Sequence, residues 1–348
     1  MRPFKDPLYL EVVITIGTQD PNQCSIRRCT SMRVLVTGGA GFIGANLVQH
    51  LSANSTYDVV VLDNLSNGQQ RPIFSRGVRF TCGDFTDQAM LTECLQGVDT
   101  VVHLAALSGV IDSVEDPRPS FEVNVAGSFQ LLELARAANV RRIINASTGG
   151  ALLGEAASPI SEEMAPCPLS PYGASKLAVE GYCTAFAGAY GLPCVTLRFS
   201  NIYGPRSAHK KSVVAAFIKS IIRKEPLVVY GDGTQQRDYL YVGDLVCGIE
   251  AALKRQLTGV YQLGSGQPTT LHTLVATLKR VSGRDFRVRY EARRSGEVHS
   301  TWCNTAKAAR EFGYNAPTDL ETGLQTTWSW YLENREIWVW QQAWSASD

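Results

Sequence analysis

A tyrosine and a lysine four residues apart, Tyr172 and Lys176, are the residues of this sequence best suited to acid–base chemistry. A free phenol ionises near pH ~10, so tyrosine is a poor base at neutral pH. In a helix the lysine lies one turn after the tyrosine, and its positive charge favours the phenolate. The spacing predicts that Tyr172 is a general base for a substrate hydroxyl, with its pKa lowered toward the working pH. By itself, the pair could also be two surface residues of an amphipathic helix.

The glycine-rich run 37–44 predicts the cofactor that such a base would serve. It follows an apolar run at 33–37 and precedes a helical pattern, a context typical of dinucleotide binding. Gly38 and Gly41 let the backbone turn and approach a pyrophosphate, which would face the helix N-terminus. Gly44 lets the helix pack closely on the strand. We therefore expect the dinucleotide at this turn.

Asp63 indicates which dinucleotide is bound. It ends the apolar run 58–62 and lies about 20 residues beyond Gly44, where a ribose hydroxyl is expected. A carboxylate there accepts a hydrogen bond from a free 2′-hydroxyl and repels a 2′-phosphate. This favours NAD over NADP, unless Asp63 is only a turn residue at the strand end.

Alternating strand and helix patterns must position these residues. Apolar runs near 33–37, 58–62, 78–82, 99–104, 141–146 and 194–199 predict parallel strands. Helical patterns near 44–53, 87–96, 118–139 and 172–190 separate them. We predict an α/β fold, a doubly wound parallel Rossmann sheet with a smaller C-terminal α/β substrate lobe.

The sequence predicts two domains between two terminal segments of different character. Residues 32–200 are predicted to form the NAD-binding domain and residues 201–333 mainly the substrate lobe, with later returns to the sheet. Met32 directly precedes the first strand, so residues 1–31 are interpreted as an extension outside the fold or a start-codon artefact. The tail 334–348 continues a tryptophan-rich segment, expected to pack on the small lobe or to form a partner surface.

The composition excludes several classes of partner. A net charge of +1 gives no reason to expect nucleic acid or an anionic membrane. No apolar run reaches the ~20 residues of a membrane span. The nine cysteines are scattered without metal-ligand spacing, so we expect no metal and a cytoplasmic protein with reduced thiols.

Nine motifs together carry a resemblance to a known family. They are TGGAGFIG at 37–44, VVVLDNLSNG at 59–68, GDFTD at 83–87, VVHLAA at 101–106, NVAGS at 124–128, YGASK at 172–176, RFSNIYGPR at 198–206, GDGTQQRDYLYVGDL at 231–245 and RRSGE at 293–297. From about Met32 to about Glu333 the sequence resembles the extended short-chain dehydrogenases/reductases of the NAD-dependent epimerase/dehydratase family, most closely the UDP-glucose 4-epimerase branch. The resemblance implies tightly held NAD, a UDP-sugar substrate and a homodimer.

The resemblance also implies further site residues. Those at the cofactor are Gly38, Gly41, Phe42, Ile43, Gly44, Asp63, Asn64, Asp84, Phe85, Leu104, Ala105, Ala106, Asn124, Tyr172 and Lys176. Those at the substrate are Asn201 and Arg237 and Arg294 on the diphosphate, Glu297 on the uridine ribose, and Thr301 near the sugar. His103 is expected to be packed or to lie beside a phosphate, without a catalytic role. Ser295 replaces the usual proline of its loop.

The second catalytic hydroxyl departs from the best-known family pattern. Gly149 stands where many relatives carry serine or threonine, and Leu153 replaces the usual tyrosine. The nearest hydroxyls are Thr148 and Ser147. We assign the hydrogen bond to the sugar O4 to Thr148, with Ser147 as the substitute, or else both only satisfy backbone groups at the strand end.

The same stretch separates related reactions. Dehydratases of the family carry Asp-Glu at the positions of Gly150 and Ala151, and decarboxylases carry Glu at the latter. Epimerisation at C4 needs neither acid, so we predict a 4-epimerase for UDP-glucose or UDP-GlcNAc that acts through a transient 4-keto sugar. The alternatives are a UDP-glucuronate epimerase, a dehydratase with a displaced acid, a reductase, or a non-catalytic NAD-binding scaffold or sensor.

Overall fold

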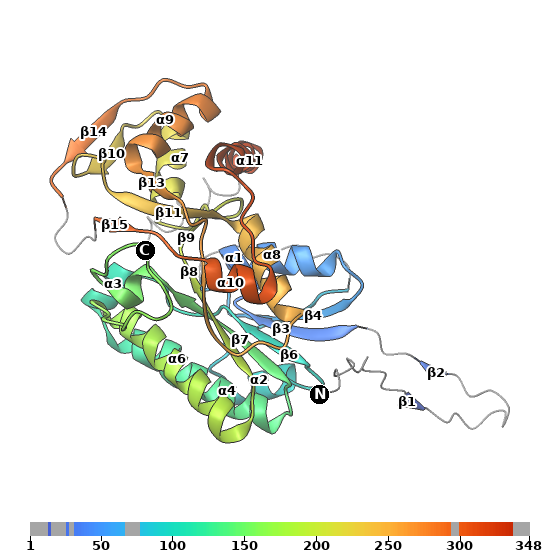
Figure 1. The fold of residues 1–348 in the computed structure, drawn as a ribbon. Coiled ribbons are helices and arrows are strands. Elements are labelled where there is room, and N and C mark those ends of the chain that lie inside the picture. The colour runs from blue at the N-terminus through green and yellow to red at the C-terminus, as the bar shows by residue number, and fades with distance from the viewer. Residues whose placement is uncertain (1–12, 15–25, 28–30, 67–76, 294–298, 337–348) are drawn as a thin grey trace, which may run out of the picture.

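The computed structural model describes residues 13–14, 26–27, 31–66, 77–293 and 299–336 (Figure 1). Its largest element is a seven-stranded sheet in the order β12-β8-β7-β6-β3-β4-β5, and every pair in it is parallel. Its strands are β3 (Met32–Thr37), β4 (Tyr57–Asp63), β5 (Arg79–Cys82), β6 (Thr100–His103), β7 (Arg142–Thr148), β8 (Cys194–Phe199) and β12 (Gly259–Leu263). The predicted doubly wound sheet is confirmed.

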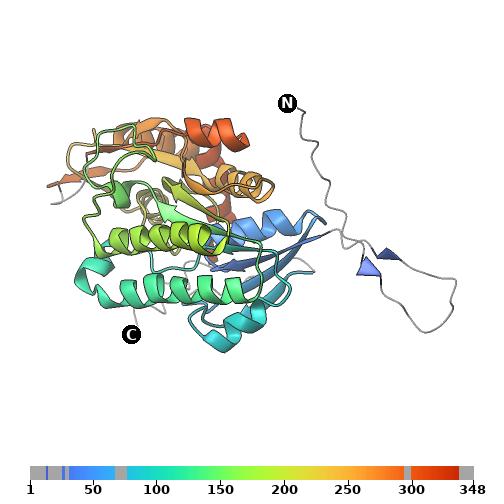
Figure 2. The ribbon, with the colours of Figure 1, turned by 60° about the horizontal axis from the view of Figure 1, so that its bottom comes forward.

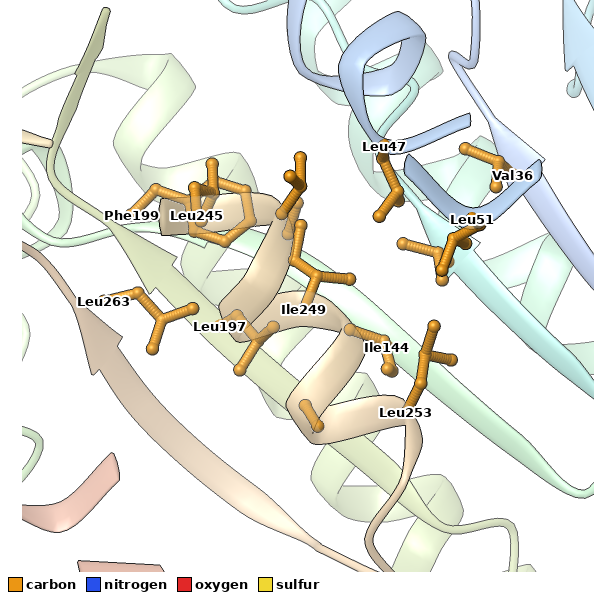
Figure 3. Packing of buried hydrophobic residues seen from close by; sticks show 14 of the residues in the cluster. Val36, Leu47, Leu51, Ile144, Leu197, Phe199, Leu245, Ile249, Leu253 and Leu263 are labelled. Atoms are coloured by element: carbon orange, nitrogen blue, oxygen red, sulfur yellow. The ribbon is translucent and has the colours of Figure 1, made fainter. Parts of the chain in front are cut away.

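Helices cover both faces of this sheet, which explains why its central strands are apolar along their length. The helices of this part are α1 (Phe42–Ser52), α2 (Gln88–Cys94), α3 (Val110–Glu115), η1 (Ser120–Gly127), α4 (Ser128–Ala137), α5 (Gly150–Leu153), α6 (Pro171–Tyr190), α8 (Val242–Leu253) and α10 (Ala306–Phe312). On one face, Leu47 and Leu51 of α1 meet Ile249 and Leu253 of α8 above the sheet (Figure 3). On the other face, α2, α4 and α6 enclose a second apolar cluster, and Figure 2 shows α4 and α6 side by side.

The chain reverses its direction across the sheet between β3 and β6. From β3 it proceeds through β4 to β5 on one side, and from β6 through β7 and β8 on the other. Ligands of such sheets bind beyond the carboxyl ends of the strands at this reversal. The order of the strands therefore predicts where the cofactor lies.

A smaller lobe stands beyond that edge of the sheet (Figure 1). Its elements are β9 (Asn201–Tyr203), α7 (Val213–Arg223), β10 (Leu227–Tyr230), β11 (Gln236–Tyr241), β13 (Pro268–Thr270), α9 (Leu271–Ser282), β14 (Val288–Glu291), β15 (Ser300–Thr301) and α11 (Leu320–Glu333). Strand β11 pairs with β9, β13 and β15, while β10 pairs with β14. Between these segments the chain returns to the sheet through α8 and β12.

The ends of the chain differ in how they join these lobes. Strands β1 (Val13–Ile14) and β2 (Ile26–Arg27) pair only with each other and lie away from the sheet (Figures 1 and 2). Trp328 of α11 is buried in the core of the small lobe, and Trp330 packs against that core. The other tryptophans of the tail, at 338, 340 and 344, lie outside the described residues.

Among the described helices, none combines the length and apolar character that a membrane crossing requires.

Candidate functional site

The glycine turn after β3 lies at the reversal of the sheet, against the end of β6. Gly38 has φ +70°, and a Cβ added to it would lie 2.7 Å from the backbone nitrogen of Ala105. Both the left-handed backbone and the lack of space restrict this position to glycine. The backbone of this turn therefore lies directly against the backbone of residues 104–106, the segment of Leu104 to Ala106 that follows β6.

Gly44 closes the same turn onto α1. A Cβ there would lie 2.1 Å from the Gly38 carbonyl oxygen and 2.7 Å from Gly39 Cα. Helix α1 begins after Gly41, which offers no side-chain cap. The N–H groups at the start of this helix are thus left to a ligand, and a helix N-terminus of this kind binds pyrophosphate.

Asp63, Asn64 and Asp84 make two separate sets of hydrogen bonds beside this turn. The Asp63 carboxylate accepts hydrogen bonds from the Ala40 N–H at 2.9 Å and the Leu65 N–H at 2.8 Å. Asn64 Nδ2 donates to Asp84 Oδ2 at 2.8 Å. Burial alone would raise the pKa of Asp84, but hydrogen bonds from Thr86 and Asn64 lower it overall. Carboxylate oxygens accept more than one hydrogen bond, so Asp63 can hold this turn and still accept a hydrogen bond from a ligand hydroxyl.

His103 is packed, as expected, and bridges two elements. Its ring nitrogens lie 2.7 Å from Thr37 Oγ1 and 2.9 Å from Ser128 Oγ. Burial and the nearby charge of Lys176 lower its pKa to about 3. The ring is neutral at physiological pH and joins β3 to α4 through two hydrogen bonds. Phe85 contacts it edge-on, with ring centroids 5.1 Å apart.

Tyr172 and Lys176 lie on the first turns of α6, at the same edge of the sheet. The helix begins at Ser170, whose side chain accepts a hydrogen bond from the Gly173 N–H, and proline follows at the first helical position. Lys176 is buried, and its Nζ donates to the Ala146 carbonyl of β7 at 2.9 Å. Burial lowers the pKa of Lys176 to about 8.

The predicted lowering of the Tyr172 pKa is wrong for the protein alone. Burial raises this pKa to about 12, and the charge of Lys176 does not offset it. The ammonium is committed to the strand carbonyl of Ala146, so the desolvation of the phenol dominates. A spacing of four residues places the two groups on one helix face but does not decide which partner the lysine binds.

Three polar side chains hold Tyr172 in place, and the sequence analysis missed the role of two of them. The Tyr172 N–H donates to Ser113 Oγ at 3.1 Å, and Ser175 Oγ donates to the Tyr172 carbonyl at 2.8 Å. Asn124 Nδ2 donates in turn to Ser175 Oγ at 3.0 Å and to the Leu107 carbonyl. Ser175 stands inside the YGASK motif, so its position was a signal that could have been used.

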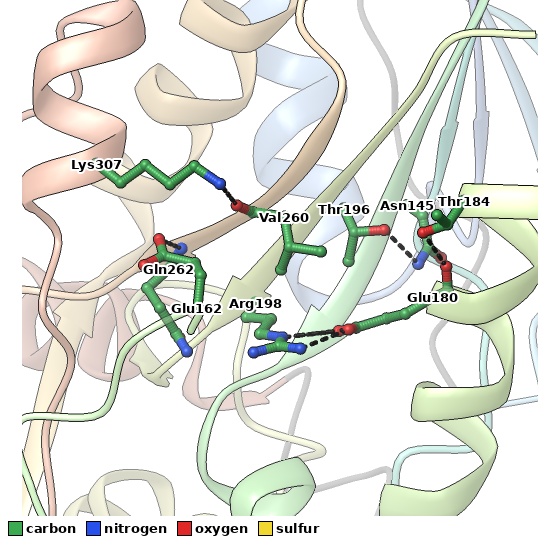
Figure 4. A network of polar contacts seen from close by, with 9 residues as sticks. All are labelled: Asn145, Glu162, Glu180, Thr184, Thr196, Arg198, Val260, Gln262 and Lys307. Atoms are coloured by element: carbon green, nitrogen blue, oxygen red, sulfur yellow. Dashed lines mark hydrogen bonds and ion pairs between the residues drawn. The ribbon is translucent and has the colours of Figure 1, made fainter. Parts of the chain in front are cut away.

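A buried ion pair anchors α6 to the sheet below the tyrosine. Arg198 of β8 donates to Glu180 of α6 through Nη2 at 2.7 Å and Nε at 2.9 Å (Figure 4). Both side chains are buried, so losing one partner would leave an uncompensated charge. The pair fixes the position of α6, and with it Tyr172 and Lys176, relative to the strand ends.

The hydroxyls after β7 differ in exposure. Ser147 is buried, and its Oγ has no hydrogen-bond partner in the described structure. Thr148 is half-buried. A Cβ on Gly149 would lie 2.9 Å from Gln262 Oε1 and 3.0 Å from Ile160 Cδ1, so neighbouring side chains already occupy the space beside Gly149.

The small lobe brings Asn201 and Arg237 to one cavity of about 320 Å³. Its lining residues are Asn201, Ile202, Lys211, Ser212, Val213, Val214, Ala216, Phe217, Val228, Tyr230, Gln235, Arg237, Tyr239 and Leu271. Thr301 pairs with Arg237 across β15 and β11. A Cβ on Gly150 would lie 3.3 Å from Thr301 Cγ2, so Thr301 reaches the segment after β7. Arg294 and Glu297 lie outside the described residues.

Most of the cavity was not predicted from the sequence. Phe217 and Tyr230 carry no motif that distinguishes them from core residues, and Lys211 gave no signal beyond the pair Lys210-Lys211. The folding of β9, α7, β10 and β11 brings them together. Among the described residues, no group of three or more His, Cys, Asp or Glu could hold a metal ion.

The described residues fit NAD. Gly38 and Gly44 leave a backbone cradle that a Cβ would fill, the N-terminus of α1 is uncapped, and Asp63 stands beside both. A carboxylate in this place suits a ribose with a free 2′-hydroxyl.

Comparisons with known proteins support the fold and the cofactor. Residues 34–264 match the NAD dependent epimerase/dehydratase family. A putative UDP-glucose 4-epimerase of Methanocaldococcus jannaschii is 34% identical over 305 residues, which are 86% of this chain and 99% of that protein.

Two solved structures are similar over nearly their whole length. UDP-glucose 4-epimerase of Thermotoga maritima, with UDP-glucose, gives a TM-score of 0.83 at 36% identity and covers 87% of this chain and 100% of its own. UDP-N-acetylglucosamine 4-epimerase of Methanobrevibacter ruminantium M1, in complex with UDP-N-acetylmuramic acid, gives 0.83 at 30% identity, with 88% and 99% covered. By its sequence and its fold, the chain belongs to the NAD dependent epimerase/dehydratase family, in its extended short-chain dehydrogenase/reductase form.

Proposed function

We propose that this chain is an NAD-dependent UDP-sugar 4-epimerase that acts through a transient 4-keto sugar. One observation carries the proposal: Tyr172 and Lys176 lie at the reversal of an NAD-binding sheet, while the segment facing them after β7 bears no carboxylate at Gly150 or Ala151. A general base without a second acid suits reversible oxidation at one carbon. The UDP-sugar 4-epimerases among the related proteins support the substrate class.

Tyr172 is the base in this mechanism. It takes the proton of the sugar O4 as the C4 hydride leaves. It returns the proton after the 4-keto sugar has rotated to present its other face. NAD, when bound, supplies the acceptor for that hydride and is regenerated at the end. The pKa of about 12 means that Tyr172 is protonated in the protein alone, and a positively charged cofactor bound beside it would favour the phenolate.

Thr148 is the proposed donor to the sugar O4. Its half-buried position at the end of β7 supports this role better than that of Ser147, which is buried beneath the strand end. Ser147 is the substitute if Thr148 is not required. A threonine hydroxyl both accepts and donates a hydrogen bond, so it can serve the alcohol and the ketone in turn.

The 4-keto sugar must rotate while the diphosphate of the nucleotide stays bound. Arg237 and Asn201 line the same cavity, and a guanidinium suits phosphate through its fork of N–H groups. We propose that Arg294 joins them on the diphosphate and that Glu297 binds the uridine ribose. The residues that bind the nucleotide then lie in the small lobe, and the sugar is left free to rotate near Tyr172.

Dehydration and decarboxylation are disfavoured by the shape of the segment after β7. A Cβ on Gly173 would lie 2.2 Å from the Ala151 carbonyl oxygen, so this turn packs directly on α6. Neither Gly150 nor Ala151 has a side chain that could donate or accept a proton. The general acid that removes water in dehydratases has no counterpart here.

Thr301 supports acceptance of N-acetylated sugars. Its small side chain lies next to Gly150, so a larger side chain would take room between the two lobes. We expect turnover of UDP-GlcNAc as well as UDP-Glc, and Thr301→Tyr should reduce turnover of the N-acetyl sugar about tenfold or more relative to UDP-Glc. Equal turnover of both sugars by this variant would contradict the assignment.

The proposal extends to the assembly and the location of the protein. Phe121 of η1 and Tyr182 and Tyr190 of α6 are exposed aromatic side chains on two helices that contact each other, which suits a homodimer interface. A single monomeric mass at all concentrations in light scattering would contradict it. The described cysteines are free thiols, in keeping with a cytoplasmic enzyme, which cell fractionation would test.

The deciding experiment follows the sugar by NMR without added NAD. The protein is incubated separately with UDP-Glc, UDP-GlcNAc, UDP-GlcA and a dTDP-sugar. The C4 epimer of a UDP-hexose is the expected product, and its formation without added cofactor would show that NAD is carried bound. No conversion of any sugar, even with NAD added, would overturn the proposal in favour of a non-catalytic binder.

A further inference from the structure

Lys211 links the rim of the substrate cavity to the segment that contacts the base. It lines the cavity together with Asn201 and Arg237, and its Nζ lies 3.6 Å from Asp112 Oδ1 of α3. The next residue of α3, Ser113, accepts the hydrogen bond from the Tyr172 N–H. The ion pair therefore spans the two lobes directly beside the reaction site.

The charge of the cavity is one-sided. Lys211 and Arg237 are the cations among its lining residues, and no lining residue that the structure describes is a carboxylate. Arg237 already donates through Nη1 to the carbonyls of Gln236 at 2.8 Å and His299 at 3.1 Å. A diphosphate entering this cavity would gain from a second cation.

Lys211 can move to such a ligand at little cost. Its side chain is 90% exposed and that of Asp112 is 66% exposed. Exposed pairs of this kind are worth little, because water screens them and two long side chains must be ordered. The neighbouring Lys210 donates from Nζ to Ser108 Oγ at 3.1 Å, which holds the backbone of the segment while the Lys211 side chain can turn.

We propose that Lys211 is a further substrate-binding residue, which exchanges Asp112 for the diphosphate of the nucleotide sugar when the substrate enters. The inference rests on the proposed function, since it requires a nucleotide diphosphate in this cavity. Asp112 holds the lysine between turnovers and competes with the ligand. Binding of the diphosphate in the small lobe thereby breaks a contact between Lys211 and α3, the helix that contacts the catalytic tyrosine.

Calorimetric binding of uridine, UMP and UDP tests the exchange independently of turnover. Lys211→Gln should weaken UDP about tenfold and leave uridine unchanged, because a charge-assisted bond to phosphate is lost. Asp112→Asn should tighten UDP about twofold, since the competing carboxylate is removed. Lys279→Gln is the matched control, because Lys279 forms an exposed pair with Asp285 at 2.9 Å and does not line the cavity.

The outcomes separate this inference from the proposed function. If the unchanged protein binds UDP and epimerises UDP-sugars but Lys211→Gln binds UDP equally well, the role of Lys211 is refuted alone. Equal weakening of uridine and UDP would also refute it, since the residue would then shape the cavity and not bind phosphate. If the unchanged protein binds no UDP, both proposals fail together.

Discussion

The cofactor side and the substrate side of this site are built in opposite ways. The cofactor side consists of strand ends of one sheet, held by backbone contacts such as that between Gly38 and Ala105. The substrate side is assembled from side chains of β9, α7, β10 and β11, which surround a cavity of about 320 Å³. A rigid surface suits a cofactor that stays bound. A cavity that contacts only the nucleotide end of the substrate suits a sugar that must rotate. We therefore expect substitutions on the cofactor side to act by displacing the backbone, and substitutions on the substrate side to act by removing single side-chain contacts.

Tyr172→Phe should give the largest effect. Removal of the base should lower kcat by about 10³-fold or more, in the upper part of the range for acid–base groups. Turnover is measured by NMR, and NAD content by absorbance after release. Because the ring remains, NAD and UDP should still bind, and loss of binding would instead indicate a damaged site.

Gly44→Ala tests the rigidity of the cofactor side. The added Cβ would lie 2.1 Å from the Gly38 carbonyl oxygen, and backbone cannot yield as a side chain can. We expect NAD to bind about 100-fold more weakly, a cost of about 3 kcal/mol at the upper end for overpacking. NAD affinity is measured by fluorescence titration.

Gly188→Ala in α6 is the control for that substitution. No atom lies within 4 Å of its added Cβ, so it should stabilise the helix by about 0.5–1 kcal/mol and leave NAD binding intact. If both alanine variants bound NAD equally well, the cradle would not be as rigid as the contacts indicate.

The pH dependence of NAD binding tests Lys176. Its pKa of about 8 means that the ammonium is charged below this pH and neutral above it. A charged donor binds a ribose oxygen more strongly than a neutral amine, so NAD affinity should fall as the pH rises through about 8, by about tenfold in all. Lys176→Met should bind NAD weakly at every pH and lose this step. An unchanged step in that variant would assign the titration to another group.

Gly149→Ser should give the smallest effect. The new side chain would meet Gln262 Oε1 at 2.9 Å and Ile160 Cδ1 at 3.0 Å, both ends of side chains that can shift. We expect kcat within a few-fold of the unchanged protein and a loss of stability of about 1 kcal/mol. A large gain in kcat would show that Thr148 does not supply the hydroxyl. Thr148→Val measures that role directly and should lower kcat more than Ser147→Ala.

The motifs predicted the cofactor side well because its chemistry is local. The turn of Gly38 to Gly44, the strand end at Asp63 and the helix with Tyr172 each lie within one short segment, and parallel strands bring their ends to one edge. The predicted strands and helices of residues 33–199 were confirmed for the same reason. Fold and cofactor could therefore be predicted from spacing alone.

Prediction failed where distant contacts compete. Burial raises the pKa of Tyr172 where the spacing had predicted a fall, and Lys176 binds the Ala146 carbonyl of a distant strand. Ser113 holds Tyr172 from 59 positions away in the chain, and nothing near the motif indicates this contact. Such partners depend on packing, which a local pattern does not contain.

The sequence by itself determined the family, the parallel sheet and the preference for NAD, and it predicts Tyr172 as the base, because each rests on residue types at short spacing. Only the tertiary structure decided how Lys176 is used, which hydroxyl after β7 is accessible, and that Lys211 lines the cavity beside Arg237. These follow from desolvation and from contacts between segments far apart in the chain, and both arise only when those segments pack together in the folded protein.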